Sequence, residues 1–314
     1  MRCTQLKWKP DSPTRTQQVR KYDGSVIQPI NTLVLAGEPV RDAVLSQLRS
    51  RLAAAGSPNV VLATVLVGDD GPSQKYVASK HRTANEIGIS SIHVQLPATA
   101  TQSDVEARVA ELVVDPSVHG ILVQLPLPGH LNADAIVDLL PPEKDVDGLT
   151  SASMGRLMRG LPGHIGCTPL GVLRLLQHYE IPTAGKHAVV IGRSTLVGLP
   201  LSVLLARRGI DCTVTMAHSQ TLGLDTLCQS ADIVISATGV AHSISSAHTR
   251  PGAVVIDVGI SRTDSGLVGD VDADSVRGIA GALTPMPGGT GLMTVACLME
   301  NTVNAAVMQG VRIP

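Results

Sequence analysis

The segment that decides the fold runs from residue 187 to residue 209 and reads HAVVIGRSTLVGLPLSVLLARRG. Its first five residues form an apolar run that predicts a strand buried on both faces. The leucines and valines that follow predict a helix beginning at about Val197. Gly192 and Gly198 lie near the turn between strand and helix. Glycine allows a close backbone approach, and a helix N-terminus offers free N–H groups, so this turn predicts a site for a pyrophosphate.

The spacing of these glycines is Gly-x5-Gly, which is also compatible with a tight turn that binds nothing. The next predicted strand ends in His218, Ser219 and Gln220. A site for NAD favours Asp or Glu at this point to bond the ribose hydroxyls, and neither is present. Arg193 and Ser219 are suited to a 2′-phosphate, so we expect NADP as the cofactor.

Strands and helices alternate on both sides of this segment. This alternation predicts an α/β protein with parallel sheets and helices on both faces. The expected strands are residues 60–67, 92–96, 120–125, 187–191, 212–216, 231–237 and 253–258. The expected helices are residues 41–55, 73–87, 103–114, 169–179, 197–208 and 293–308.

A stretch rich in Gly, Ser, Met and Arg interrupts the alternation at residues 150–166. We therefore predict two α/β domains with a cleft between them, the second a Rossmann-like dinucleotide-binding domain. The predicted domains are residues 31–160, completed by a C-terminal helix within 290–314, and residues 161–289.

Composition excludes several classes of protein. The 314 residues carry a formal net charge of −1, so no basic field attracts nucleic acid or an anionic membrane. No apolar run approaches the ~20 residues of a membrane span. The five scattered cysteines form no CxxC pair and the histidines show no metal-like spacing, so we expect a reducing compartment, the cytoplasm, and no metal site.

The basic residues 1–30 predict a plain extension, with an organelle transit peptide as the alternative.

A possible chemical pair lies in the first predicted domain. Tyr76 and Lys80 are four residues apart on a predicted helix and share one face. This spacing is common on helix surfaces. It is also that of short-chain dehydrogenases, but those enzymes place the pair after the glycine turn, whereas here it comes more than a hundred residues before it. Only a cleft between two domains would bring this pair to a dinucleotide.

Three further segments end predicted elements. Gln124, in GILVQLPLPGH, stands at the carboxyl end of a strand, where ligands of α/β proteins bind. Asp145 and Asp147, in KDVDGL, are turn acids, which usually cap helices or face solvent. The segment TPMPGGTGLMT is a loop rich in Gly and Pro that leads into the last predicted helix. Without a functional role it would be a simple connector between the domains.

Together these segments resemble the methylenetetrahydrofolate dehydrogenase/methenyltetrahydrofolate cyclohydrolase family. The resemblance covers about residues 33–308, with seven motifs in the family's order. They are DDGPSQKYVASK, GILVQLPLP, PPEKDVDGL, CTPLG, GRSTLVGLP, GAVVIDVGI and TPMPGGTGLMT.

The resemblance implies a bifunctional enzyme of one-carbon metabolism. It would oxidise 5,10-methylenetetrahydrofolate with NADP and hydrolyse the product to 10-formyltetrahydrofolate, a donor for purine biosynthesis. It further implies a homodimer. Lys80 would be the acid/base residue of the hydrolysis, Tyr76 would stack on the aminobenzoate ring, Gln124 would tune Lys80, and Asp147 would hold the pterin.

The resemblance also implies the rest of the two binding sites. The remaining substrate-binding residues would be Val123, Leu125, Pro287, Gly288 and Gly289. The cofactor-binding residues would be Thr168, Gly192, Arg193, Ser194, Ser219, Gly259 and Ile260.

The chain departs from the family pattern at a few positions. The family reads PGGVGPMT where this chain has Thr290 and Leu292, and Gln220 stands where some members carry a cation. Proline restricts the backbone, so we expect Leu292 to leave its loop more mobile. Two alternatives remain: a non-catalytic relative that binds folate or nucleotide, and a short-chain-type dehydrogenase.

Overall fold

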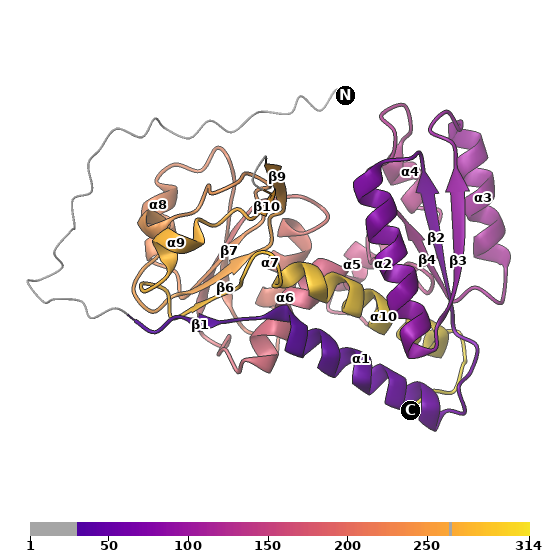
Figure 1. The fold of residues 1–314 in the computed structure, drawn as a ribbon, viewed down its shortest axis with the longest axis horizontal. Helices are drawn as coiled ribbons and strands as arrows, with labels where there is room; N and C mark the ends of the chain where they lie inside the picture. Colours follow the sequence, from indigo (N-terminus) through magenta and orange to yellow (C-terminus); the bar gives the residue numbers. More distant parts are fainter. Residues whose placement is uncertain (1–29, 264–265) are drawn as a thin grey trace, which may run out of the picture.

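The computed structural model describes residues 30–263 and 266–314. The predicted N-terminal extension therefore lies outside the described residues, apart from Ile30. Two α/β domains are joined by long helices that run between them (Figure 1). The strands are β1 (Leu33–Val34), β2 (Val61–Val67), β3 (Ser90–Leu96), β4 (Gly120–Val123), β5 (His187–Ile191), β6 (Thr213–Ala217), β7 (Ile233–Ser236), β8 (Val254–Asp257), β9 (Ser261–Thr263), β10 (Gly266–Val268) and β11 (Ala282–Leu283). The helices are α1 (Gly37–Ala54), α2 (Gly71–Ile87), α3 (Gln102–Val114), α4 (Ala133–Val137), α5 (Ser151–Met158), α6 (Cys167–His178), α7 (Gly198–Ala206), α8 (Leu224–Gln229), the 3-10 turn η1 (Ser246–His248), α9 (Ala273–Val276) and α10 (Thr290–Met308).

The first domain is built on a three-stranded parallel sheet in the order β3-β2-β4. Every residue of β2 is buried, as its continuous apolar run predicts. One face packs against α3 and α4, and the other against α2 and α10. Gln124 directly follows β4 and therefore lies at the carboxyl end of this sheet, where ligands of such sheets bind.

The second domain contains a parallel sheet in the order β1-β11-β8-β7-β5-β6. Its central strands are buried between two apolar clusters. One cluster includes residues of α7 and the other includes residues of α8 and α9. This confirms the predicted Rossmann-like arrangement of strands and helices.

Two segments depart from the predicted organisation in a way that matters for the domains. β1 pairs with β11, so Leu33 and Val34 belong to the second domain's sheet and not to the first domain. A two-residue edge strand with exposed side chains is too short to show a pattern in sequence. Residues 151–158, in the stretch expected to be irregular, form α5, capped by the Thr150 side chain that accepts from the Ser153 amide.

Leu292 is the third residue of α10, not part of the loop before the helix. Its amide donates to the carbonyl of Gly289 over 3.3 Å. The expected loop therefore ends at Gly289, three residues before Leu292. The Thr290 hydroxyl is buried and donates to the carbonyl of Asp257 over 2.8 Å. The departure from valine at position 290 thus adds a link between α10 and β8.

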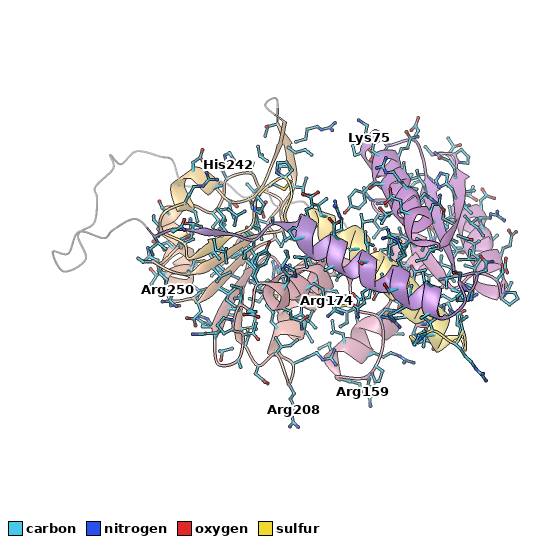
Figure 2. The ribbon with its side chains drawn as sticks, turned by 60° about the horizontal axis from the view of Figure 1, so that its bottom comes forward. Lys75, Arg159, Arg174, Arg208, His242 and Arg250 are labelled. Atoms are coloured by element: carbon cyan, nitrogen blue, oxygen red, sulfur yellow. The ribbon has the colours of Figure 1, made fainter. Side chains whose placement is uncertain are left out.

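Helices α1, α6 and α10 connect the domains. α10 packs against α6, α1 and α2, and these four helices enclose the largest apolar cluster among the described residues. Figure 2 shows α1 running from the domain that carries Arg250 toward the domain that carries Lys75. In the described part of the chain, no helix has the length and apolar character to cross a membrane.

Candidate functional site

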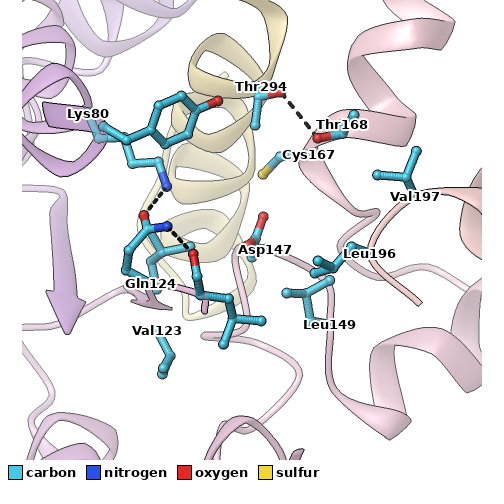
Figure 3. Close-up of a pocket in the computed structure, with 13 residues that line it drawn as sticks. Lys80, Val123, Gln124, Asp147, Leu149, Cys167, Thr168, Leu196, Val197 and Thr294 are labelled. Carbon is cyan, nitrogen blue, oxygen red and sulfur yellow. Dashed lines mark hydrogen bonds between the residues drawn. The ribbon is translucent and has the colours of Figure 1, made fainter. Parts of the chain in front are cut away.

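Lys80 is a buried cation on α2. Only 4% of its surface is exposed, and its ammonium donates to Oε1 of Gln124 over 2.9 Å. The Gln124 amide group in turn donates to the carbonyl of Leu125 over 2.7 Å, which fixes the orientation of its oxygen toward Lys80 (Figure 3). The predicted pairing of Lys80 with Gln124 is present in the structure.

Tyr76 lies one helical turn before Lys80 and on the same face, as their spacing predicts. The Lys80 ammonium lies 4.7 Å from the centroid of the Tyr76 ring. A cation at this distance is attracted to the ring face, so the aromatic ring helps to hold the lysine. Burial raises the pKa of the Tyr76 hydroxyl, which therefore stays neutral at physiological pH.

Burial also lowers the pKa of Lys80, because the charged form loses water. The negative charge of Asp147 acts in the opposite direction and favours the ammonium. Burial likewise raises the pKa of Asp147, and Lys80 lowers it. For both groups burial is the larger effect, and the attraction between their charges offsets only part of it.

The two acids of KDVDGL have different environments. Asp145 is fully buried and accepts from the amides of Leu149 and Thr150, so it shapes the turn. Asp147 points into the cavity beside Lys80 (Figure 3). The sequence pattern alone does not separate these roles, because both acids stand in the same turn.

The first cavity has a volume of about 200 Å³ and lies between the domains. It brings together the predicted residues Tyr76, Lys80, Val123, Gln124, Leu125, Asp147 and Thr168. Six of its residues were not assigned from sequence: Leu122, Leu149, Cys167, Leu196, Val197 and Thr294. All six lie within the motifs quoted from the sequence, so membership of a motif was the available signal.

The resemblance implies that Thr168 binds the cofactor, but in the structure Thr168 lines this first cavity. Its hydroxyl lies 3.2 Å from that of Thr294, which joins α6 to α10 (Figure 3). Cys167 beside it is buried, and burial raises the pKa of its thiol well above the usual range. The thiol therefore remains protonated and is not a nucleophile.

A second cavity of about 560 Å³ lies over the carboxyl ends of β5, β6 and β7. Its walls include four predicted residues: Gly192, Arg193, Ser194 and Ser219. The other lining residues were not predicted: Ile191, His218, Leu224, Ala237, Thr238, Gly239, Val240, Ser243 and Ile244. The segment 237–244 carries no recognisable sequence motif, so only the sheet topology reveals it.

The glycines of the turn are required by close contacts. A side chain at Gly198 would place its Cβ 2.1 Å from the carbonyl oxygen of Gly192. Gly192 has a φ of 130°, and a Cβ there would meet the carbonyl oxygen of Ala237 at 2.4 Å. Leu196 and Val197, in the same turn, line the first cavity. One turn thus borders both cavities.

The other predicted residues line neither cavity. Ile260 is half exposed, and a Cβ on Gly291 would lie 3.7 Å from its Cδ1. The Gly288 carbonyl accepts from the Gly37 amide over 2.7 Å, and a Cβ on Gly37 would meet the oxygen of Gly289 at 2.2 Å. Pro287, Gly288 and Gly289 therefore lie where α1 begins and α10 starts. Gly259 lies beside two buried aspartates. Residues 30–263 and 266–314 contain no cluster of His, Cys, Asp or Glu suited to a metal ion.

Comparisons with known proteins cover both domains. A family model described as "Tetrahydrofolate dehydrogenase/cyclohydrolase, catalytic domain" matches residues 35–147, and its "NAD(P)-binding domain" counterpart matches residues 166–310. The "Bifunctional protein FolD" of Methanoculleus marisnigri is 47% identical over 88% of this chain and 97% of its own. The "Bifunctional protein FolD 2" of Frankia alni is 50% identical over 78% of this chain and 84% of its own.

Solved structures agree with these matches. The bifunctional FolD enzyme of Campylobacter jejuni superposes with a TM-score of 0.86 at 40% identity, covering 88% of this chain and 99% of its own. The Trypanosoma brucei methylenetetrahydrofolate dehydrogenase-cyclohydrolase, solved with NADP and an inhibitor, gives a TM-score of 0.84 at 34% identity, covering 88% and 98%.

Proposed function

The chain belongs to the tetrahydrofolate dehydrogenase/cyclohydrolase family, and on this basis we propose how its residues divide the work of the enzyme. The enzyme oxidises 5,10-methylenetetrahydrofolate to 5,10-methenyltetrahydrofolate with NADP. It then hydrolyses this product to 10-formyltetrahydrofolate. Both steps act on the same carbon, so one folate site next to one cofactor site is sufficient.

The observation that carries the assignment of roles is the hydrogen bond between buried Lys80 and Gln124 in a cavity bordered by the turn of the second domain. Lys80 is our candidate for the proton carrier of the hydrolysis. Water adds to the methenyl carbon, and the Lys80 amine accepts the proton released. Lys80 returns this proton to the folate nitrogen as the carbon–nitrogen bond breaks, and the added hydroxyl releases its own proton to solvent as it becomes the formyl carbonyl. A pKa lowered by burial suits this exchange near neutral pH.

The neighbours of Lys80 would hold the folate. Tyr76 is suited to stack on the aminobenzoate ring, because its ring borders the cavity and stays neutral. Asp147 would accept hydrogen bonds from the amino group and ring nitrogens of the pterin. Val123 and Leu125 flank Gln124 and would supply apolar contact.

The residues of the second cavity fit a dinucleotide. The two turn glycines let the backbone of the turn pack closely at the start of α7, and Gly192 lines the second cavity, where a pyrophosphate would lie near the helix N-terminus. Arg193 and Ser219 would bind the 2′-phosphate that distinguishes NADP from NAD. When bound, NADP accepts a hydride from the one-carbon bridge of folate. Leu196 and Val197 would then exclude water where the two ligands meet.

The assignment is tested by mixing the purified protein with methylenetetrahydrofolate and NADP. We expect NADPH to form, and methenyltetrahydrofolate to decay to the formyl product. Binding of both ligands without turnover would favour the non-catalytic alternative. Reduction of NADP by alcohols, but not by this folate, would favour a short-chain-type dehydrogenase.

We further propose that the enzyme is a cytoplasmic homodimer. Four cysteines of the described residues are free thiols and buried, which suits a reducing compartment. Size-exclusion chromatography with light scattering would measure the oligomeric state. A monomer at the concentration used in the activity assays would contradict the proposed homodimer.

A further inference from the structure

Two aspartates outside the cavities are buried next to the cofactor site. Asp257 ends β8 and is 3% exposed, and Asp270, which follows β10, is completely buried. Neither has a cationic partner among the residues that contact it; their partners are backbone amides and one hydroxyl. Buried carboxylates without a cation are costly, so their contacts indicate what they hold in place.

Asp270 holds the segment that follows β7. Its Oδ2 accepts from the Ser236 hydroxyl at 3.0 Å, from the Thr238 amide at 2.6 Å and from the Gly239 amide at 3.2 Å. Thr238 and Gly239 line the second cavity. One carboxylate oxygen thus fixes the direction of the backbone that forms one wall of the proposed NADP site.

Asp257 holds the segment that follows β8. Its carboxylate accepts from the amides of Gly259, Asp270 and Val271 at distances of 2.9 to 3.0 Å. The Asp257 carbonyl accepts the hydroxyl of Thr290, the first residue of α10. This helix carries Thr294 into the first cavity. Asp257 therefore connects the start of α10 to the loop that carries Asp270.

Each aspartate carboxylate packs directly against the backbone of a glycine in the other aspartate's segment. A Cβ on Gly259 would lie 1.8 Å from Oδ1 of Asp270, and a Cβ on Gly269 would lie 1.8 Å from Oδ2 of Asp257. Any larger residue at either position would displace a carboxylate. Within the described chain, Oδ1 of Asp270 has no hydrogen-bond partner, so every hydrogen bond of this carboxylate is made by Oδ2, the oxygen that faces Thr238 and Gly239.

We propose that Asp270 and Asp257 are positioning residues of the dehydrogenase step, which set the wall of the NADP cavity and tie it to the start of α10. The proposal rests on the proposed function, since it assumes that NADP binds in the second cavity. Neither residue lines the first cavity, where Lys80 lies. The two activities of this enzyme should therefore respond differently to changes at these positions.

The test replaces Asp270 with asparagine, which keeps the size and removes the charge. Charge-assisted hydrogen bonds are about twice as strong as neutral ones, and three of them are affected. We expect Asp270→Asn to weaken NADP binding, measured by calorimetry, and to lower the dehydrogenase kcat/KM, each by about tenfold. Hydrolysis of added methenyltetrahydrofolate without NADP should keep its rate. The matched control is Asp274→Asn, an exposed position four residues along the same segment.

The outcomes separate three cases. Unchanged NADP binding in Asp270→Asn, or an equal loss of both activities, would overturn the proposal, because a merely structural carboxylate would affect both steps together. If Asp270→Asn does not fold, Asp257→Asn is measured in the same assays with the same expectation. A parent protein that neither binds NADP nor oxidises the folate would instead refute the proposed function.

Discussion

Replacing Lys80 with methionine is the sharpest test of the proposed hydrolysis. Methionine has nearly the same length and no proton to exchange. Lys80 is the only lysine among the residues that line the first cavity, and none of the others is a histidine. Since the lysine is 4% exposed, bulk water cannot readily take over its role at the same position.

The magnitude follows from the loss of one positioned acid/base. Such groups contribute roughly 10²- to 10⁴-fold, which corresponds to about 3–5 kcal/mol in the activation free energy. We expect Lys80→Met to slow methenyltetrahydrofolate hydrolysis by this factor, measured from the decay of its absorbance. Folate binding should persist, because Tyr76 and Asp147 remain.

The control is Lys75→Met, on the same helix. Lys75 is exposed at the surface of its domain (Figure 2) and does not line the cavity, so this variant should hydrolyse at the parent rate. Near-normal hydrolysis in Lys80→Met, with the control unchanged, would show that another group moves the proton and would refute the assignment of Lys80.

Three further predictions follow from the described contacts. Gln124→Met removes the oxygen that accepts from the Lys80 ammonium, so the pKa of Lys80 should fall further. We expect the limb of the hydrolysis pH profile that reports Lys80 to move toward lower pH, and an unmoved limb would contradict the coupling. Arg193→Ala should raise the KM for NADP roughly 10- to 150-fold and leave that for NAD nearly unchanged, whereas an equal rise for both would place Arg193 on the pyrophosphate. Leu292→Pro should fold and should change the folate Kd, measured by calorimetry, by less than about fivefold. Proline restricts the free backbone and so lowers the entropic cost of ordering it, but it also removes the amide that donates to Gly289, and the two effects offset each other. A larger tightening would mean that this turn becomes ordered only when folate binds.

The sequence predicts most of the fold because its strands are long apolar runs. β2 and β5 are buried on both faces, and their residues leave no alternative pattern. β1 has only two residues and is recognised by its pairing with β11, almost 250 residues away. Such a pairing depends on the tertiary structure and leaves no local signal.

The site was predicted unevenly for a similar reason. Lys80 and Gln124 stand in recognisable motifs, and the structure brings them within hydrogen-bond distance. Thr238 and Gly239 line the second cavity only because β7 ends beneath it, and their sequence resembles any loop. Asp270 is hidden in the same way, since a buried aspartate and an exposed one look alike in sequence.

The path of the chain between the domains has a consequence for biosynthesis. The first residues described enter the second domain's sheet, and the last helix covers one face of the first domain's sheet. During translation, therefore, the apolar residues Leu62 and Leu122 have only part of their cover, from α2, until α10 has left the ribosome. β1 likewise waits for β11. Neither domain is therefore expected to fold by itself. A fragment ending at residue 147 would lack α10 and would expose the apolar sheet face that this helix covers, which favours aggregation.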